Sequence, residues 1–180
     1  MKKAWAMVLT AGMFLFSGIP AQAASAAAID ADVDSTLVRF YQEVSSGKDL
    51  VKNAKGVLVF PTVIKAGIGL GGEFGEGALQ INGKTADYYN TAAASIGLQL
   101  GAQKKSIVII FQDASALEKF RSSSGWKAGV DASIAVVTVG AGGAMDTAKL
   151  KEPILGFIIG QAGLMYNLTL EGAKFTKITK

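Results

Sequence analysis

The lysines are the residues of this sequence that could most readily bind a ligand. Several fall around the junction between a predicted helix and the first predicted strands, and two more stand at a predicted turn. Ammonium groups gathered in this way hold anions, and near an anionic surface each contributes about 1 kcal/mol. The alternative is an ordinary scatter of solvated lysines, because lysine is mostly exposed in proteins. The candidate ligand-binding residues are Lys48, Lys52, Lys55, Lys65, Lys104 and Lys105.

The sequence lacks the residues of most catalytic and metal sites. It contains no histidine and no cysteine, which excludes Ser-His-Asp triads, thiol nucleophiles and ordinary zinc sites. Glu73 and Glu76 are three apart on a predicted strand, so they point to opposite faces; we expect them to be solvated or paired with Lys65. A hydrolase would have to use Glu73, Glu76 or Asp131. We therefore predict a protein that is not an enzyme and has no metal or cofactor.

Two glycine motifs resemble phosphate-binding loops without the required context. The segment 67–72 matches G-x-G-x-x-G, which binds a dinucleotide where a helix begins inside the motif. The residues that follow, 73–77, hold two more glycines and two acids and favour a strand. Gly83-Lys84-Thr85 has the ending of a phosphate loop, but Ala78 stands where that motif needs its first glycine. We expect no nucleotide at either place.

Glycines at alternate positions mark the segment from Gly67 to Gly77. Because side chains alternate between the faces of a strand, one face would be nearly bare backbone. The other face would carry the larger apolar residues Ile64, Ala66, Ile68, Leu70 and Phe74. Glycine inside a strand costs about 0.5–1 kcal/mol relative to alanine. We therefore expect another element, or a ligand, to approach the bare face closely.

Helices are predicted at the start of the chain and once more near its middle. Apolar residues at three- and four-residue steps predict an amphipathic helix over 32–44. A second short helix is predicted over 46–54, where a glycine follows as a stop. The third runs over about 114–121, capped by Asp113 or Ser115.

Strand patterns occupy the rest of the chain. Asn82-Gly83 predicts a hairpin turn, Pro61 predicts a strand end, and Lys104-Lys105 predicts a turn. Strands are expected over residues 56–61, 63–81, 88–103, 106–111 and 130–141, and residues 154–177 are expected to form two strands or one long bent strand. The predicted fold is α+β and mainly β: an antiparallel barrel-like or sandwich sheet with an N-terminal helix and a short helix near 114–121.

The first 23 residues have the pattern of a secretory signal peptide. Lys2 and Lys3 precede an uncharged, mostly apolar run to Pro20, and Ala21-Gln22-Ala23 supplies small residues for cleavage after Ala23. An uncleaved membrane anchor is the alternative. We predict a periplasmic or secreted protein whose residues 24–180 form a single domain.

The charge of that domain argues against nucleic acid as a partner. Removing residues 1–23 takes away two of the 18 basic residues and none of the 14 acidic ones, leaving 16 − 14 = +2. Nucleic-acid binders normally carry a concentrated basic stripe. No later stretch approaches 18 apolar residues, so we expect no spanning helix after the signal segment.

Several blocks of the sequence, in the same order, resemble the SYLF domain family. Together they cover roughly residues 35–175. The blocks are 54–67 (AKGVLVFPTVIKAG), 72–77 (GEFGEG), 95–103 (SIGLQLGAQ), 107–120 and 125–133 (GWKAGVDAS).

The resemblance implies a lipid-binding module. Eukaryotic SYLF domains bind phosphoinositides and other acidic phospholipids, and yeast members bind and bundle actin. Lys55 and Lys65 fall inside the matching blocks, so the resemblance implies that they contact lipid. Actin is improbable as a partner of an exported protein. We therefore expect peripheral contact with anionic phospholipid; the alternative is a cell-envelope module whose glycine-poor face packs a partner protein.

Overall fold

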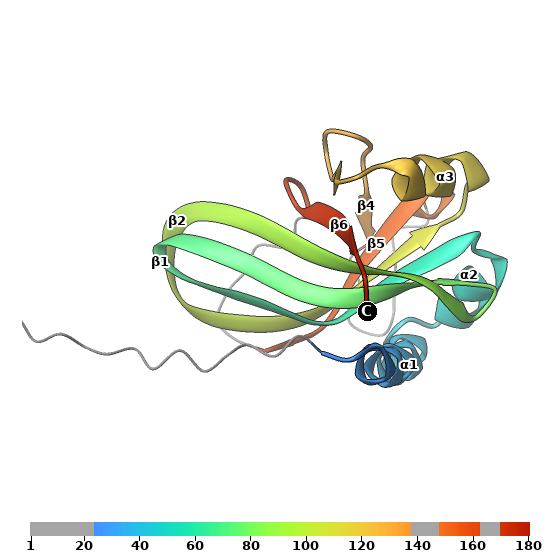
Figure 1. Cartoon of the computed structure of the whole chain (residues 1–180), viewed down its shortest axis with the longest axis horizontal. Helices are drawn as coiled ribbons and strands as arrows, with labels where there is room; N and C mark the ends of the chain where they lie inside the picture. Colours follow the sequence, from blue (N-terminus) through green and yellow to red (C-terminus); the bar gives the residue numbers. More distant parts are fainter. Residues whose placement is uncertain (1–23, 138–147, 163–169) are drawn as a thin grey trace, which may run out of the picture.

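The computed structural model describes residues 24–137, 148–162 and 170–180, which form a curled sheet with helices on both sides (Figure 1). The helices are α1 (Ala26–Glu43), α2 (Gly47–Asn53) and α3 (Ala114–Ser122), with a 3-10 turn, η2 (Lys149–Lys151). The strands are β1 (Gly56–Ile81), β2 (Lys84–Phe111), β3 (Trp126–Lys127), β4 (Ala135–Val137), β5 (Ile154–Ala162) and β6 (Lys174–Ile178). The predicted signal segment, with Ala23 at its end, lies outside the described residues.

Strand β2 organises the sheet because it pairs with three other strands. It is antiparallel to β1 along nearly its whole length, to β6 near its start and to β5 near its end. The order is β3-β6-β2-β5-β4, with β1 off this path. The predicted mainly β, barrel-like α+β fold with an N-terminal helix is confirmed. The sheet is mixed rather than wholly antiparallel, because β4 runs parallel to β5.

Strands β1 and β2 continue through two predicted breaks. The predicted end at Pro61 is wrong: the register shifts between Phe60 and Val63, and such a bulge accommodates a proline that has no N–H to donate. The predicted turn at Lys104-Lys105 is also wrong, because both residues pair with β1 inside β2. The hairpin turn at Asn82-Gly83 is confirmed, with positive φ angles of 51° and 72° that a type I′ turn requires.

The ribbon of β1 and β2 curves back on itself (Figure 1), and two glycines make this possible. A Cβ atom on Gly77 would lie 2.0 Å from the carbonyl oxygen of Val59, and one on Gly75 would lie 2.6 Å from that of Thr62. The element that approaches the bare face is thus an earlier part of β1 itself. The expectation of close packing is confirmed at these two positions. Gly72, by contrast, has nothing within 4 Å of its Cβ position.

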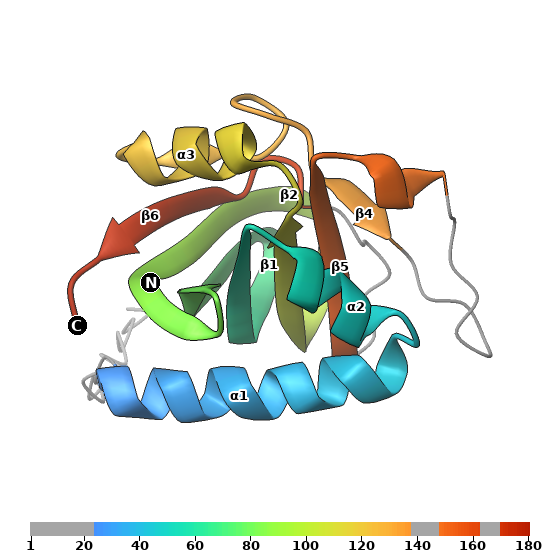
Figure 2. The same ribbon diagram turned by 90° about the vertical axis from the view of Figure 1, so that its right-hand side faces the viewer.

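Helices α1 and α3 lie on opposite sides of the sheet (Figure 2), and each side has its own hydrophobic core. Alternate residues of β1 contribute to the two cores. Val57 and Val59 pack with α1, while Leu58 and Phe60 pack on the side of α3. The rings of Phe40 in α1 and Phe157 in β5 meet edge to face at 5.0 Å. The aromatic residues of the opposite core are Phe60, Tyr89, Phe111, Phe120, Trp126 and Phe175.

The helices begin where side chains cap them. Helix α1 starts six residues before its predicted start because Ser25 accepts a hydrogen bond from the backbone N–H of Ala28 at 3.2 Å. Helix α3 is capped by Asp113, which accepts from the backbone N–H of Ala116 at 2.9 Å. Hydrogen bonds from the Ser115 hydroxyl and from Ala116 lower the pKa of Asp113. None of the helices in the described ranges is long and apolar enough to cross a membrane.

The last predicted strands are only partly within the described residues. Within the predicted strand 130–141, only β4 is a strand in the described residues, and residues 138–141 lie outside the described part. The segment 154–177 contains two strands, β5 and β6, which both pair with β2; residues 163–169 between them are not described.

Candidate functional site: a lysine groove beside α2

A groove of about 390 Å³ lies between α2 and the turn that joins β1 to β2. The side chains of α2 form one wall, and the end of β1 with its turn forms the other. The hairpin therefore brings residues 80–83 next to residues 48–54. The groove is lined by Tyr41, Lys48, Val51, Lys52, Ala54, Gly56, Val57, Gln80, Asn82 and Gly83.

Two of the predicted ligand-binding lysines, Lys48 and Lys52, line this groove. They come from α2, which lies within the predicted helix 46–54. Residues four apart share one face of a helix, and like charges at that spacing cost about 0.2–0.5 kcal/mol. Asp49 in the first turn and Lys52 in the last offset this through the helix dipole. Both lysines are exposed, so the groove presents two ammonium groups to solvent.

The other polar groups of the groove are uncharged. None of the residues that line it within the described structure is an aspartate or glutamate. Tyr41 contributes its side chain from α1; burial raises the pKa of this phenol, and the charge of Asp34 raises it further. The Tyr41 hydroxyl therefore stays protonated at neutral pH. Together with the side-chain amide of Asn82, it offers hydrogen-bond donors that suit an anion. The side-chain amide of Gln80 already donates to Oδ1 of Asp34 at 3.2 Å.

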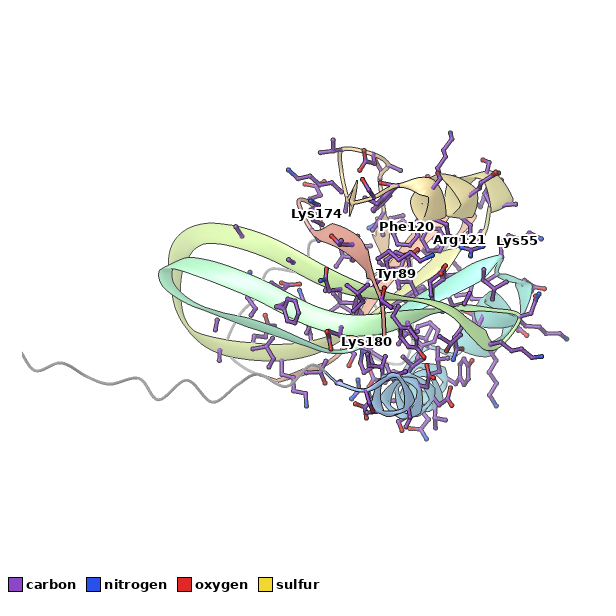
Figure 3. All side chains as sticks on the ribbon, viewed as in Figure 1. Lys55, Tyr89, Phe120, Arg121, Lys174 and Lys180 are labelled. Atoms are coloured by element: carbon purple, nitrogen blue, oxygen red, sulfur yellow. The ribbon has the colours of Figure 1, made fainter. Side chains whose placement is uncertain are left out.

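Lys55 extends this positive surface past the end of α2 (Figure 3). It is exposed, and its backbone N–H donates to the carbonyl of Phe111 at 2.8 Å, which fixes it beside the sheet. The sequence prediction missed Lys84, which is also exposed and follows groove-lining Gly83. It missed Tyr41 as well. The hairpin turn predicted at Asn82-Gly83 could have pointed to Lys84, which follows it directly. No sequence signal near Tyr41 indicates that it lies opposite this turn.

The remaining three predicted lysines lie elsewhere. Lys104 is exposed on β2, opposite Ile64, which is seven residues beyond the groove along β1, or roughly 20 Å at 3.3 Å per residue. Lys65 and Lys105 are only 7% and 2% exposed. The Lys105 ammonium pairs with Glu73 at 2.9 Å, so the expected pairing of Glu73 with Lys65 is wrong. The structure thus brings together Lys48, Lys52 and Lys55.

The carboxylates that a hydrolase would need have separate partners in the described structure. Glu73 pairs with Lys105, and Glu76 pairs with Lys180 at 2.8 Å. Asp131 accepts a hydrogen bond from the backbone N–H of Lys127 at 2.5 Å. No two of these three carboxylates form a pair with each other in the described residues.

A second surface runs along the outer face of the β1–β2 ribbon. Ile64 is 54% exposed and Phe74 is 53% exposed, and both belong to the glycine-poor face predicted from the sequence. Ala92, which faces Phe74 across the ribbon, and Ala102, which faces Ala66, are exposed too. Apolar side chains here are open to solvent on both strands.

Comparison with known proteins finds a family model and a relative that this chain resembles. Residues 92–180 match the family model described as Ysc84, Las17-binding protein actin regulator. The chain is also 29% identical over 150 residues to beta cell expansion factor A of Aeromonas veronii, an alignment that covers 82% of this chain. The chain spans about half, 55%, of that curated relative. The resemblance to the SYLF family seen in the sequence is thus confirmed by a Ysc84 family match over residues 92–180 and by this relative.

Proposed function

We propose that this chain is a non-enzymatic protein that binds anionic phospholipid head groups, from the periplasm or as a secreted protein. The observation that carries the proposal is the pair Lys48 and Lys52 on a groove whose described lining holds no carboxylate. Lys55 belongs to the same surface. The resemblance to lipid-binding SYLF domains supports the ligand class. Lys65 and Lys105 are left out of the proposed site because their side chains are buried.

The strength of such a contact follows from the number of charges. Each lysine near an anionic membrane contributes about 1 kcal/mol, and the attraction falls off within a Debye length. Replacing a lysine by glutamate removes one attraction and adds one repulsion, so each reversal costs about 2 kcal/mol. Two reversals therefore weaken binding on the order of a thousandfold at low salt, because about 1.4 kcal/mol is tenfold.

The test is co-sedimentation of the purified chain with vesicles of phosphatidylcholine, alone or mixed with phosphatidylglycerol, at low and raised salt. We expect binding only to the anionic vesicles, weakened by salt. Lys48→Glu with Lys52→Glu abolishes it, and Lys55→Glu alone weakens it roughly thirtyfold.

The matched control is Lys119→Glu with Lys151→Glu, which changes the net charge equally at exposed positions outside the groove. We expect this variant to retain most of the binding. Equal loss in both double variants would show attraction by net charge alone, without a site at the groove. Failure of the wild-type chain to bind either vesicle would refute the proposed function.

A second candidate function is a protein-interaction module of the cell envelope. The observation that favours it is the exposed apolar face around Ile64 and Phe74. A protein with this function would associate with a partner through this face and would not bind lipid. Phe74→Ser would then abolish association while leaving vesicle sedimentation unchanged.

A further inference from the structure

Three segments that are distant in the sequence meet at Ala24. The backbone nitrogen of Ala24 donates to Oε2 of Glu76, on β1, at 3.3 Å. The other carboxylate oxygen of Glu76 accepts from Nζ of Lys180 at 2.8 Å, and the same Nζ donates to the carbonyl oxygen of Ala24 at 3.0 Å. Figure 3 labels Lys180 close to α1. The residue that follows the predicted cleavage position is thus held by a carboxylate.

We propose that Glu76 is the receptor for the amino terminus that cleavage after Ala23 creates. An export peptidase would add water across the peptide bond between Ala23 and Ala24. The carbonyl carbon of Ala23 then becomes a carboxylate, and the nitrogen of Ala24 leaves as an amine that takes up a proton. The resulting ammonium forms an ion pair with Oε2 of Glu76. This inference rests on the predicted signal peptide and is independent of lipid binding.

The Ala24 amide makes only a long hydrogen bond to Glu76, which an ammonium in its place would shorten and strengthen. A distance of 3.3 Å is long for a neutral N–H···O bond, whose usual length is about 2.9–3.0 Å. Charge-assisted bonds are shorter, about 2.7–2.9 Å, and roughly twice as strong. The Glu76 and Lys180 side chains are only 19% and 7% exposed, so solvent screens the site incompletely. Freed from the preceding chain, Ala24 can close this distance.

Glu76 is the carboxylate that can accept a hydrogen bond from the amino group of Ala24. Among the residues that the structure describes, Glu76 and Lys180 are the charged side chains that form hydrogen bonds with Ala24. The nearest acid of α1, Asp30, accepts hydrogen bonds from Thr85 and Tyr88. The ion pair would therefore fasten the start of α1 to β1 and to the segment after β6.

The first measurement is the mass of the chain after export from a bacterium that expresses it in full. We expect the mass of residues 24–180 with alanine at the amino terminus. A chain that retains residues 1–23, or one that begins at another residue, would overturn the proposal. This readout requires no variant and no lipid.

The second measurement is an NMR titration of the α-amino group in the exported protein. An α-amine ordinarily titrates near pH 7.7–8.0. The Glu76 carboxylate favours the ammonium form of Ala24, whereas the Lys180 ammonium opposes it. Because the carboxylate contacts the nitrogen itself and Lys180 contacts the carbonyl oxygen, we expect the Ala24 pKa above this range. A folded-state pKa that is raised adds stability below the unfolded pKa, and this stability is lost as pH rises through the folded value. The free energy of unfolding should therefore fall more steeply above pH 8 in the wild type than in Glu76→Gln.

The matched control is Glu118→Gln, an exposed carboxylate on α3, which should leave the titration of Ala24 unchanged. An Ala24 pKa within the ordinary range in the wild type would overturn the ion pair even if Glu76→Gln fails to fold. Because none of these readouts involves vesicles, a failure here is distinguishable from a failure of the lipid-binding proposal.

Discussion

Lys104 and Lys105 show at the scale of the residue how neighbours can differ in role. They are adjacent on β2, so their side chains point to opposite faces. Lys104 is exposed, whereas Lys105 is buried and paired with Glu73 at 2.9 Å. A buried pair of this kind is a structural contact, because each charge compensates the other. The Lys105 ammonium is therefore not accessible to a lipid head group in this structure.

We predict that Lys105→Met destabilises the fold and acts on lipid binding only through stability. The Glu73 carboxylate, whose side chain is 9% exposed, would lose its partner, and leaving one buried charge uncompensated costs about 3–5 kcal/mol. Urea denaturation measures this loss. Adding Glu73→Gln in the same chain should recover part of it. A stable Lys105→Met variant that no longer binds anionic vesicles would instead assign Lys105 to the binding site.

The β1–β2 ribbon shows at the scale of the element why glycine is required at particular positions. Gly75 and Gly77 allow the end of β1 to lie against its own beginning, where the nearest atoms belong to the backbone. Gly72 lies in the same strand but faces open space. The alternation of glycines therefore has a packing role at some positions and not at others.

We predict opposite effects for two glycine substitutions in β1. Gly77→Ala would place a methyl group 2.0 Å from the Val59 carbonyl oxygen, and relieving such a clash by moving backbone costs about 1–3 kcal/mol or more. Gly72→Ala meets no atom within 4 Å and should leave stability unchanged or raise it by up to about 1 kcal/mol. Thermal unfolding of the two variants compares them directly. Equal destabilisation by both would contradict the close packing inferred for Gly77.

At the scale of the whole molecule, the charged groove and the apolar face are distinct surfaces. The groove lies at the hairpin turn beside α2. The exposed Ile64 and Phe74 lie farther along β1, and the ribbon of β1 and β2 projects away from the helices (Figure 1). One flat membrane in contact with α2 would therefore leave the projecting ribbon available for other contacts.

We predict that the chain is monomeric in solution without vesicles. The large apolar side chains that the described structure exposes come from three parts of the chain: Val38 from α1, Ile64 and Phe74 from β1, and Val130 from the loop after β3. A stable dimer buries about 800 Å² of surface on each partner, which calls for a more continuous patch. Light scattering over a range of protein concentrations measures the mass. A dimer that Phe74→Ser dissociates would favour the interaction module over the lipid-binding proposal.

Much of the local structure was predictable because it depends on short-range rules. Asn82-Gly83 predicted its hairpin turn, and the α3 cap at Asp113 was one of the two expected. The early start of α1 was missed because its signal, Ser25, stands among alanines without strong periodicity. The continuity of β1 through Pro61 was missed because a bulge depends on the partner strand.

The sequence by itself determined the alternation of side chains along β1 and β2, the helices and the absence of histidine and cysteine chemistry. Only the tertiary structure decided which lysines remain available to a ligand. Alternation separates Lys104 from Lys105 but does not say which of them faces inward; the curl of the ribbon buries Lys105 against Glu73. The same curl brings the turn at residues 82–83 against α2, so the groove is formed by contacts between residues that are about thirty positions apart.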